Sequence, residues 1–204
     1  SKSLAFTIGA PSEFQTLVTI QAEDRTPGDG TSVTIPTTGG QIVIRDASNP
    51  EPSTQPGMTN GLWNGAFGTD GNTNSNDGIP GGYADFGSTN NDFLTFTFNA
   101  DDAGSALLRF RYSNGSGNRP LSVEVNGTVI ATQAFAPTGS FGTWAVVEVP
   151  ANLIAGVNKV TLRSTANTGP NIDQLEVLVP NAPPVEEPEE PQAPNDGTET
   201  VNGV

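Results

Sequence analysis

Short segments in which apolar and polar residues alternate, separated by turn-forming residues, most constrain the fold of this chain. In the segment 91–99, Leu94, Phe96 and Phe98 fall on one face and two threonines on the other. Alternation with period two is typical of a half-buried β-strand, and no segment has a convincing helical period. Together with 24 glycines and 17 prolines, the pattern predicts an all-β fold, a β-sandwich (jelly roll) of about eight to nine strands.

The alternation places candidate strands along most of the chain. The segments 32–35 and 41–45 are expected to pair as a hairpin. A second hairpin is indicated by Asn126-Gly127, because this dipeptide is the strongest short-range turn signal between two strands. The other candidate strands are 17–24, 91–99, 106–112, 121–125, 128–132, 144–149, 157–163 and 172–179.

Composition divides the chain into three parts: a segment at 1–16, the sandwich at 17–179 and a linker at 180–204. The last part holds six acids and many prolines but no aromatic residue. Such a segment cannot bury enough apolar surface to fold alone, so we expect an extended linker to a neighbouring domain of a larger protein. Within the sandwich, the long polar stretch 46–82 contains Trp63 and Phe67 and is expected to be a functional or flexible loop.

Composition also limits the chemistry. The chain has no cysteine and no histidine, which excludes nucleophile–histidine catalysis and disulfides. A formal net charge of −14 argues against binding to nucleic acid or anionic membranes, and no apolar run approaches the ~20 residues that span a bilayer. Carboxylates and amides favour calcium, and the composition is typical of an exported, extracellular protein.

Three oxygen-bearing side chains form a candidate cation site. Gln21 and Glu23 lie two residues apart in a predicted strand, so their side chains leave the same face. Asp173 alternates in phase with the apolar residues of the last strand, and a carboxylate that faces the core is costly unless it is paired or binds a metal. The alternation alone leaves two interpretations open, a calcium ligand or a solvated residue at a frayed strand end.

Five segments resemble, in order, the carbohydrate-binding modules of families 35 and 6. They are QAED, GGYADFGSTNNDFLTFTF, RFRYSNGSGNRPLSVEVNG, GTWAVVEVPANLIAGVNKVTL and GPNIDQLEV, and they span about 18–178. The resemblance implies a structural calcium ion held by Gln21, Glu23 and Asp173. The family often has Glu where Gln21 stands, and a neutral ligand there would lower the charge of the site.

The resemblance also implies that sugar binds at the loops along one edge of the sandwich. Tyr83 matches the family's first aromatic residue at this edge, and Trp144 matches the second. Because Ala145 and Val147 alternate inward, Trp144 is expected to point outward. A core role for Trp144 is the alternative, and Phe141 is a rival for the same stacking position.

Polar residues complete the implied sugar site. Asn171 matches the family's last-loop amide, and Asn114 and Arg119 match positions that often touch ligand. Turn formation by Asn114 and a surface ion pair by Arg119 are equally open interpretations. Alternating oxygen side chains in 70–77 are similar to a calcium loop, although a polar flexible loop fits them better.

These features predict a non-catalytic, calcium-dependent module that targets an extracellular protein to polysaccharide or cell-surface glycan. A spacer or cell-contact module of a calcium-binding surface adhesin is the alternative. Paired carboxylates can hydrolyse glycosides, but the acids placed by the motifs, Glu23 and Asp173, are those expected on calcium.

Overall fold

The fold is built entirely from strands within the part of the chain that the computed structural model describes. That part comprises residues 14–24, 30–36, 42–52, 55–66, 81–87, 92–166 and 168–181. It contains no helix that is long and apolar enough to cross a membrane. The prediction of an all-β sandwich is confirmed, with strands β1 to β13 in the described residues.

One sheet, called sheet A, forms the layer that carries the candidate site. Its strand order is β11-β8-β13-β6-β3. β6 pairs only with the start of β13, and β1 pairs with the rest of the same edge of β13. The strands are β1 (Phe14–Gln21), β3 (Val43–Arg45), β6 (Tyr83–Asp85), β8 (Gly104–Ser113), β11 (Trp144–Leu153) and β13 (Asn171–Pro180).

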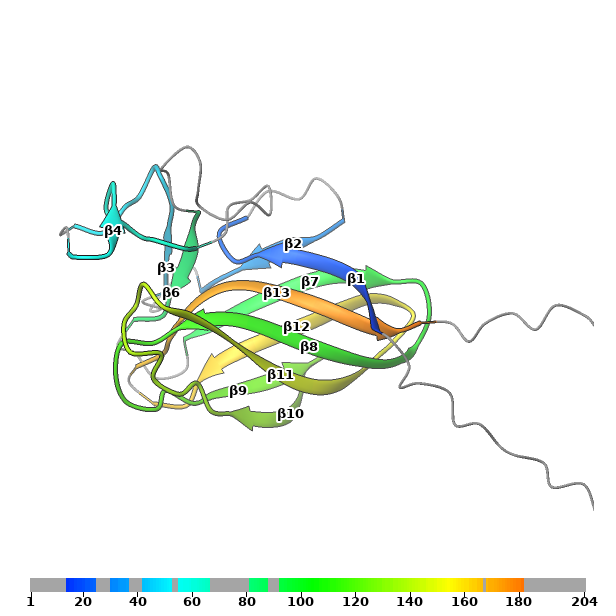
Figure 1. Cartoon of the computed structure of the whole chain (residues 1–204). Helices are drawn as coiled ribbons and strands as arrows, with labels where there is room; N and C mark the ends of the chain where they lie inside the picture. Colours follow the sequence, from blue (N-terminus) through cyan, green and yellow to red (C-terminus); the bar gives the residue numbers. More distant parts are fainter. Residues whose placement is uncertain are drawn as a thin grey trace, which may run out of the picture.

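The second layer, sheet B, has the order β10-β9-β12-β7-β2 and faces sheet A across the core (Figure 1). The strands are β2 (Ser32–Thr34), β7 (Phe93–Ala100), β9 (Leu121–Val125), β10 (Thr128–Gln133) and β12 (Gly156–Ser164). The pairing within both layers is antiparallel. Because successive side chains of a strand point to opposite faces, each strand presents one face to the core and the other outward.

Alternation explains the core. Leu94, Phe96 and Phe98 are almost completely buried, whereas the threonines between them are partly exposed on the outer face. The inward residues of both sheets form one continuous cluster. Phe135 lies in this cluster without belonging to a strand, with its ring edge-on to those of Phe110 and Tyr112.

Two hairpin predictions have opposite outcomes. Asn126 and Gly127 both have positive φ, of 51° and 82°, and join the antiparallel strands β9 and β10 as predicted. The hairpin predicted between 32–35 and 41–45 is wrong. β2 pairs with β7 in sheet B and β3 pairs with β6 in sheet A, because the chain crosses from one layer to the other between these segments.

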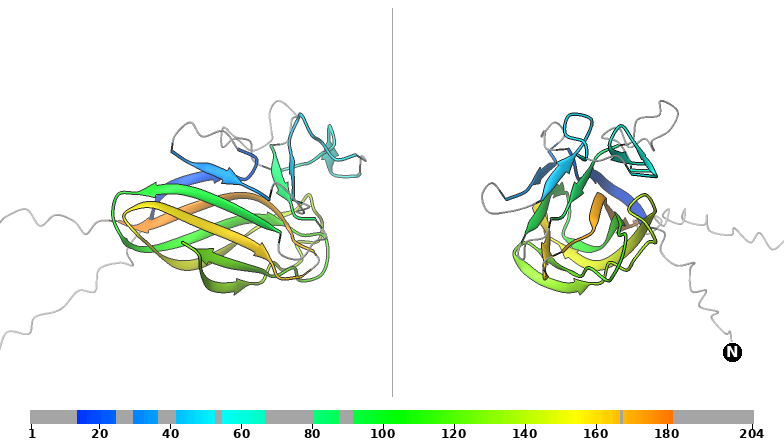
Figure 2. Two further views of the ribbon diagram at one scale, coloured as in Figure 1. Left: turned by 180° about the vertical axis from the view of Figure 1, so that it is seen from behind. Right: turned by 90° about the vertical axis from the view of Figure 1, so that its left-hand side faces the viewer.

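A small third layer covers one end of sheet A. The strands β4 (Met58–Thr59) and β5 (Leu62–Trp63) pair with each other and with neither sheet. They lie at the end of the sandwich near β3 and β6, opposite the end where β1 begins and β13 stops (Figures 1 and 2). We call residues 55–66 the covering segment.

Candidate functional site

The covering segment forms a second hydrophobic cluster with sheet A, separate from the main core. Its buried members come from the covering segment and from β6 of sheet A. Met58, Phe141 and Trp144 pack against them while remaining partly exposed. The buried members are Leu62, Trp63, Ala66 and Tyr83. The structure therefore gathers four aromatic side chains from distant parts of the chain at one end of the sandwich.

Trp144 points away from the main core, as its phase in the sequence predicts. Ala145 and Val147 pack against the main core instead. The Trp144 indole Nε1–H donates a hydrogen bond of 3.0 Å to the carbonyl of Asn64 in the covering segment. The guanidinium carbon of Arg111 lies 5.0 Å from the Trp144 ring centroid. These two polar contacts hold the Trp144 ring in place within an otherwise apolar cluster.

Tyr83 lies beside Trp144, with 5.9 Å between the ring centroids, but it has no exposed surface. Its hydroxyl donates a hydrogen bond of 3.2 Å to Oε1 of Glu51. Burial, reinforced by the negative charges of Glu51 and Asp85, holds the pKa of Tyr83 above its ordinary value. The open stacking face expected for Tyr83 is absent from the described structure, because the covering segment packs over the ring.

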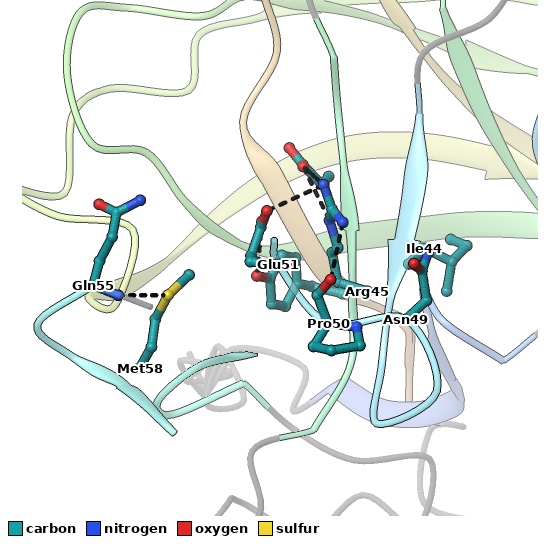
Figure 3. A network of polar contacts seen from close by, with 9 residues as sticks. Ile44, Arg45, Asn49, Pro50, Glu51, Gln55 and Met58 are labelled. Carbon is teal, nitrogen blue, oxygen red and sulfur yellow. Dashed lines mark hydrogen bonds and ion pairs between the residues drawn. The ribbon is translucent and has the colours of Figure 1, made fainter. Parts of the chain in front are cut away.

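Glu51 also belongs to an ion-pair network that anchors the chain just before the covering segment. Arg45 contacts Glu51 Oε2 at 3.1 Å and Asp85 Oδ2 at 3.3 Å, and it donates a hydrogen bond to the carbonyl of Pro50 (Figure 3). The pKa of Asp85 is raised to about 6, mainly by burial and in part by the negative charge of Glu51, while Arg45 opposes the rise. One guanidinium thus holds two carboxylates at the base of the segment.

Phe141 and Arg119 form the outer part of the aromatic cluster. The guanidinium carbon of Arg119 lies 5.1 Å from the ring centroid of Phe141. The ring centroids of Trp63 and Phe141 are 5.9 Å apart. A Cβ at Gly115 would come within 2.6 Å of the Phe141 ring, so only glycine allows this approach. Arg119 also donates a hydrogen bond of 2.7 Å to the carbonyl of Gly169, and burial lowers its pKa.

Asn114 is a structural residue of its loop in this fold. It is fully buried, and its Nδ2 donates hydrogen bonds to the carbonyls of Gly117 and Phe135 at 2.6 and 2.8 Å. Its Oδ1 accepts a hydrogen bond from the backbone amide of Ser116. The structure supports the turn-forming interpretation of Asn114, because the amide is already saturated and has no surface to offer a sugar.

We expect Asn114→Ala to lower the stability of the fold by about 1–3 kcal/mol, because two carbonyls and an amide lose a buried partner. Sugar affinity, measured well below the melting temperature, should stay within about twofold of the wild type. Thermal melts and titration calorimetry on the same sample check both parts. A stable variant with lost binding would instead make Asn114 a ligand contact.

Asn171 stands at the start of β13 between two neighbours, opposite Ser113 of β8 and Asp85 of β6. It is 3% exposed. Since Ser113 also faces Trp144 in the register of β8 and β11, Asn171 belongs to the same end of sheet A as the aromatic cluster. It supports that end from within the sheet and exposes little of its own amide.

The predicted cation ligands Gln21 and Glu23 lie at the adjoining end of β1, and both are buried. Oε1 of Gln21 and both carboxylate oxygens of Glu23 have no hydrogen-bond partner among the described residues. The pKa of Glu23 is raised to about 8, mainly by burial and in part by the negative charge of Asp173, while the nearby backbone groups of Glu23 and Gly82 oppose the rise. A Cβ at Gly82 would come within 2.5 Å of Glu23 Cγ, so glycine is needed beside this carboxylate.

Asp173 is completely buried, but not in the way that the alternation predicts. The register of β13 against β8 shifts between Ile172 and Gln174. Ile172 therefore faces the main core together with Leu175, and the carboxylate of Asp173 meets Arg111, with 2.6 Å between Oδ2 and Nη1. The prediction that Asp173 points to the core side is wrong because of this bulge.

The three predicted ligands nevertheless come together. The backbone amide of Ala22, between Gln21 and Glu23, donates a hydrogen bond of 2.8 Å to the carbonyl of Asp173. Buried oxygens without partners are what an oxygen-ligated cation would satisfy, so the residues fit such an ion. Within the described ranges, no three Asp, Glu, His or Cys side chains form a group that could hold a metal, and the predicted loop 70–77 lies outside those ranges.

Sequence reasoning missed the residues that hold the site together. Arg45 and Glu51 fall in short or irregular segments that carry no period. Arg111 was visible as an outward residue of an alternating strand, but Arg109 has the same phase. Only the pairing of β8 with β13 in the fold brings Arg111 to Asp173.

A cavity of about 470 Å³ lies at the opposite end of the sandwich, where β1 begins and β13 ends. Its lining includes Leu17, Val179 and the two acids Asp101 and Asp102, but no aromatic residue. Because sugar rings are commonly held by stacking on aromatic faces, the aromatic end of sheet A is the better candidate.

The chain belongs to the carbohydrate-binding modules of family 6, whose family model matches residues 63–178, more than half of the chain. Among solved structures, it is similar to a family 35 module from Paenibacillus barcinonensis, with 26% identity and a TM-score of 0.56, over 81% of this chain and 99% of that one. A family 35 module from Clostridium thermocellum has 24% identity and a TM-score of 0.55, over 78% and 95% of the two chains. At this lower identity, the likeness to the Clostridium thermocellum module shows only that the two chains share a fold.

The curated relatives are much longer proteins. A cycloisomaltooligosaccharide glucanotransferase from Niallia circulans is 35% identical over 108 residues, which is 52% of this chain and 11% of the relative. An endo-1,4-beta-xylanase B from Cellvibrio japonicus is 32% identical over 110 residues, 52% of this chain and 18% of the relative. The chain thus spans only a tenth to a fifth of the length of these relatives.

Proposed function

We propose that this chain is a non-catalytic carbohydrate-binding module that targets a larger extracellular protein to polysaccharide. The observation that carries the proposal is the aromatic cluster at one end of sheet A, in a chain that belongs to a carbohydrate-binding family. Trp144 and Phe141, both partly exposed, would stack on the sugar, and Arg119 would donate hydrogen bonds to its hydroxyls. Tyr83 and Asn171 would support this surface from beneath.

The relatives narrow the class of ligand. They include a cycloisomaltooligosaccharide glucanotransferase and an endo-1,4-beta-xylanase, so neutral glucans and xylans are the first ligands to test. In such enzymes a module of this kind would raise the local concentration of substrate. A spacer or cell-contact role in a surface adhesin is the alternative, and an absence of sugar binding would favour it.

The test is titration calorimetry of the whole chain against isomaltooligosaccharides, xylooligosaccharides and acidic oligosaccharides, with calcium present. Isolated modules of this kind should bind with a Kd in the micromolar to millimolar range, about −8 to −4 kcal/mol. If no glycan binds at millimolar concentration, the targeting proposal is wrong and the spacer role replaces it.

We further propose that Gln21, Glu23 and Asp173 hold one calcium ion. The support is chemical: three buried side chains bring carboxylate and amide oxygens together, and three of these oxygens have no hydrogen-bond partner in the described part of the chain. The role of the ion would be structural, since it would join the end of β1 to the bulge of β13.

Saturating calcium should therefore stabilise the fold, by about 2.7 kcal/mol when its free concentration is 100 times Kd. For a domain of this size, that corresponds to a rise of roughly 5–10 °C in melting temperature. Glu23→Ala should remove most of this rise, and Glu148→Ala, at a surface ion pair, is the matched control. A melt that is the same in calcium and in excess chelator contradicts the calcium site.

A further inference from the structure

Arg111 contacts three parts of the molecule that are far apart in the sequence. Its Nη1 lies 2.6 Å from Oδ2 of Asp173, and its Nη2 donates a hydrogen bond of 2.7 Å to the carbonyl of Gly65. Its guanidinium carbon lies 5.0 Å from the ring centroid of Trp144. One side chain therefore contacts the candidate cation site, the covering segment and the candidate sugar-binding surface.

The contacts of Arg111 are largely shielded from water and suit the shape of a guanidinium group. The side chain of Arg111 is 15% exposed and that of Asp173 is 0% exposed, so water screens their attraction little. A planar guanidinium can use separate N–H groups for a carboxylate and a carbonyl while its face covers an aromatic ring. Lysine cannot reproduce this arrangement, because its ammonium is a single compact charge.

The charge of Arg111 is also directed at a predicted cation ligand. Asp173 brings one negative charge to the site, Glu23 brings another when ionised, and Gln21 brings none. Because Arg111 already places a positive charge on Asp173, a divalent cation at the same carboxylate would be repelled by the guanidinium and would compete with it. Any change in how tightly Asp173 holds Arg111 reaches Trp144 and Gly65 through the same guanidinium.

We propose that Arg111 is a positioning residue that couples cation binding at Gln21, Glu23 and Asp173 to the placement of Trp144 and the covering segment. This inference rests on the proposed calcium site and not on the identity of the sugar. Coupling of this sort is reciprocal, so a ligand that stacks on Trp144 changes the affinity for the cation by the factor by which the cation changes the affinity for that ligand.

The experiment is a titration of the whole chain with calcium chloride, followed by tryptophan fluorescence and by calorimetry. Both tryptophans, Trp63 and Trp144, belong to the aromatic cluster, so their emission reports on it directly. In the wild type, calcium should change the emission. In Arg111→Met, calcium should bind about fivefold more tightly or better, the lower end of typical coupling, because the competing charge is gone, but the emission should no longer respond.

Two further variants keep the test decisive. Arg111→Lys retains a charge near Asp173 and should bind calcium close to the wild-type affinity, yet it should lose most of the emission change because it cannot hold all three partners. Arg109→Met is the matched control, since Arg109 lies on the same face of β8 and pairs only with Glu148 and Glu176 among the described contacts. It should behave as the wild type.

The outcomes separate the two proposals. If calcium neither binds nor stabilises the wild type, the calcium site is refuted and the coupling with it. If calcium binds and stabilises the wild type but leaves its emission unchanged, or if Arg111→Met responds as the wild type does in both affinity and emission, the calcium site stands and the coupling through Arg111 is overturned.

Discussion

Replacing Trp144 by leucine should weaken binding of the module's oligosaccharide by about fivefold or more, because loss of a stacked ring removes about 1 kcal/mol or more of favourable contact. Leucine keeps apolar volume against Tyr83 and the covering segment. It removes the ring face, the hydrogen bond to Asn64 and the contact with the Arg111 guanidinium. Titration calorimetry against the best ligand of the panel measures the change, and a thermal melt of each variant shows whether the fold is retained.

Phe141→Ala should have an effect of similar size, since the Phe141 ring forms the outer part of the same surface beside Arg119. Val146→Ala is the matched control: Val146 lies on the same face of β11 as Trp144, two residues away, and is 50% exposed. It should bind as the wild type does. Full binding by a folded Trp144→Leu variant would place the sugar elsewhere, and a strong effect of Phe141→Ala alone would make Phe141 the main stacking residue.

The main core could be predicted from the sequence because it follows from alternation. The nine-residue pattern around Phe96 and the turn at Asn126-Gly127 each determine local structure without help from the rest of the chain. Strand pairing is different. The segments 32–35 and 41–45 are close in sequence and equally suited to a hairpin, yet they belong to different layers, and nothing local distinguishes pairing from crossing.

The candidate site shows the same limit. The rule of alternation fails at Asp173, because one extra residue in β13 reverses which side chains face the core. The covering segment has almost no regular secondary structure, so no repeat of apolar residues in its sequence indicates that it packs over Tyr83. The residue types and their convergence were predictable, whereas the burial of Tyr83 and the contact between Arg111 and Asp173 depend on the assembled fold.

The burial of Tyr83 leads to a prediction that separates support of the site from direct contact with sugar. Tyr83 is 0% exposed and packs beneath Trp144, so Tyr83→Ala should destabilise the fold by about 3–5 kcal/mol, as other large-to-small changes of buried aromatic residues do. In a domain of this size, the melting temperature should fall by roughly 6–20 °C.

Tyr83→Phe is the informative partner of this variant, because it keeps the ring and removes only the hydroxyl that donates to Glu51. Glu51 retains its ion pair with Arg45 at 3.1 Å, so the cost should be about 1 kcal/mol and sugar affinity should be unchanged. If Tyr83→Ala instead abolishes sugar binding while its melt matches that of the wild type, the covering segment must open in solution. Tyr83 would then contact the sugar directly, as the sequence motif implies.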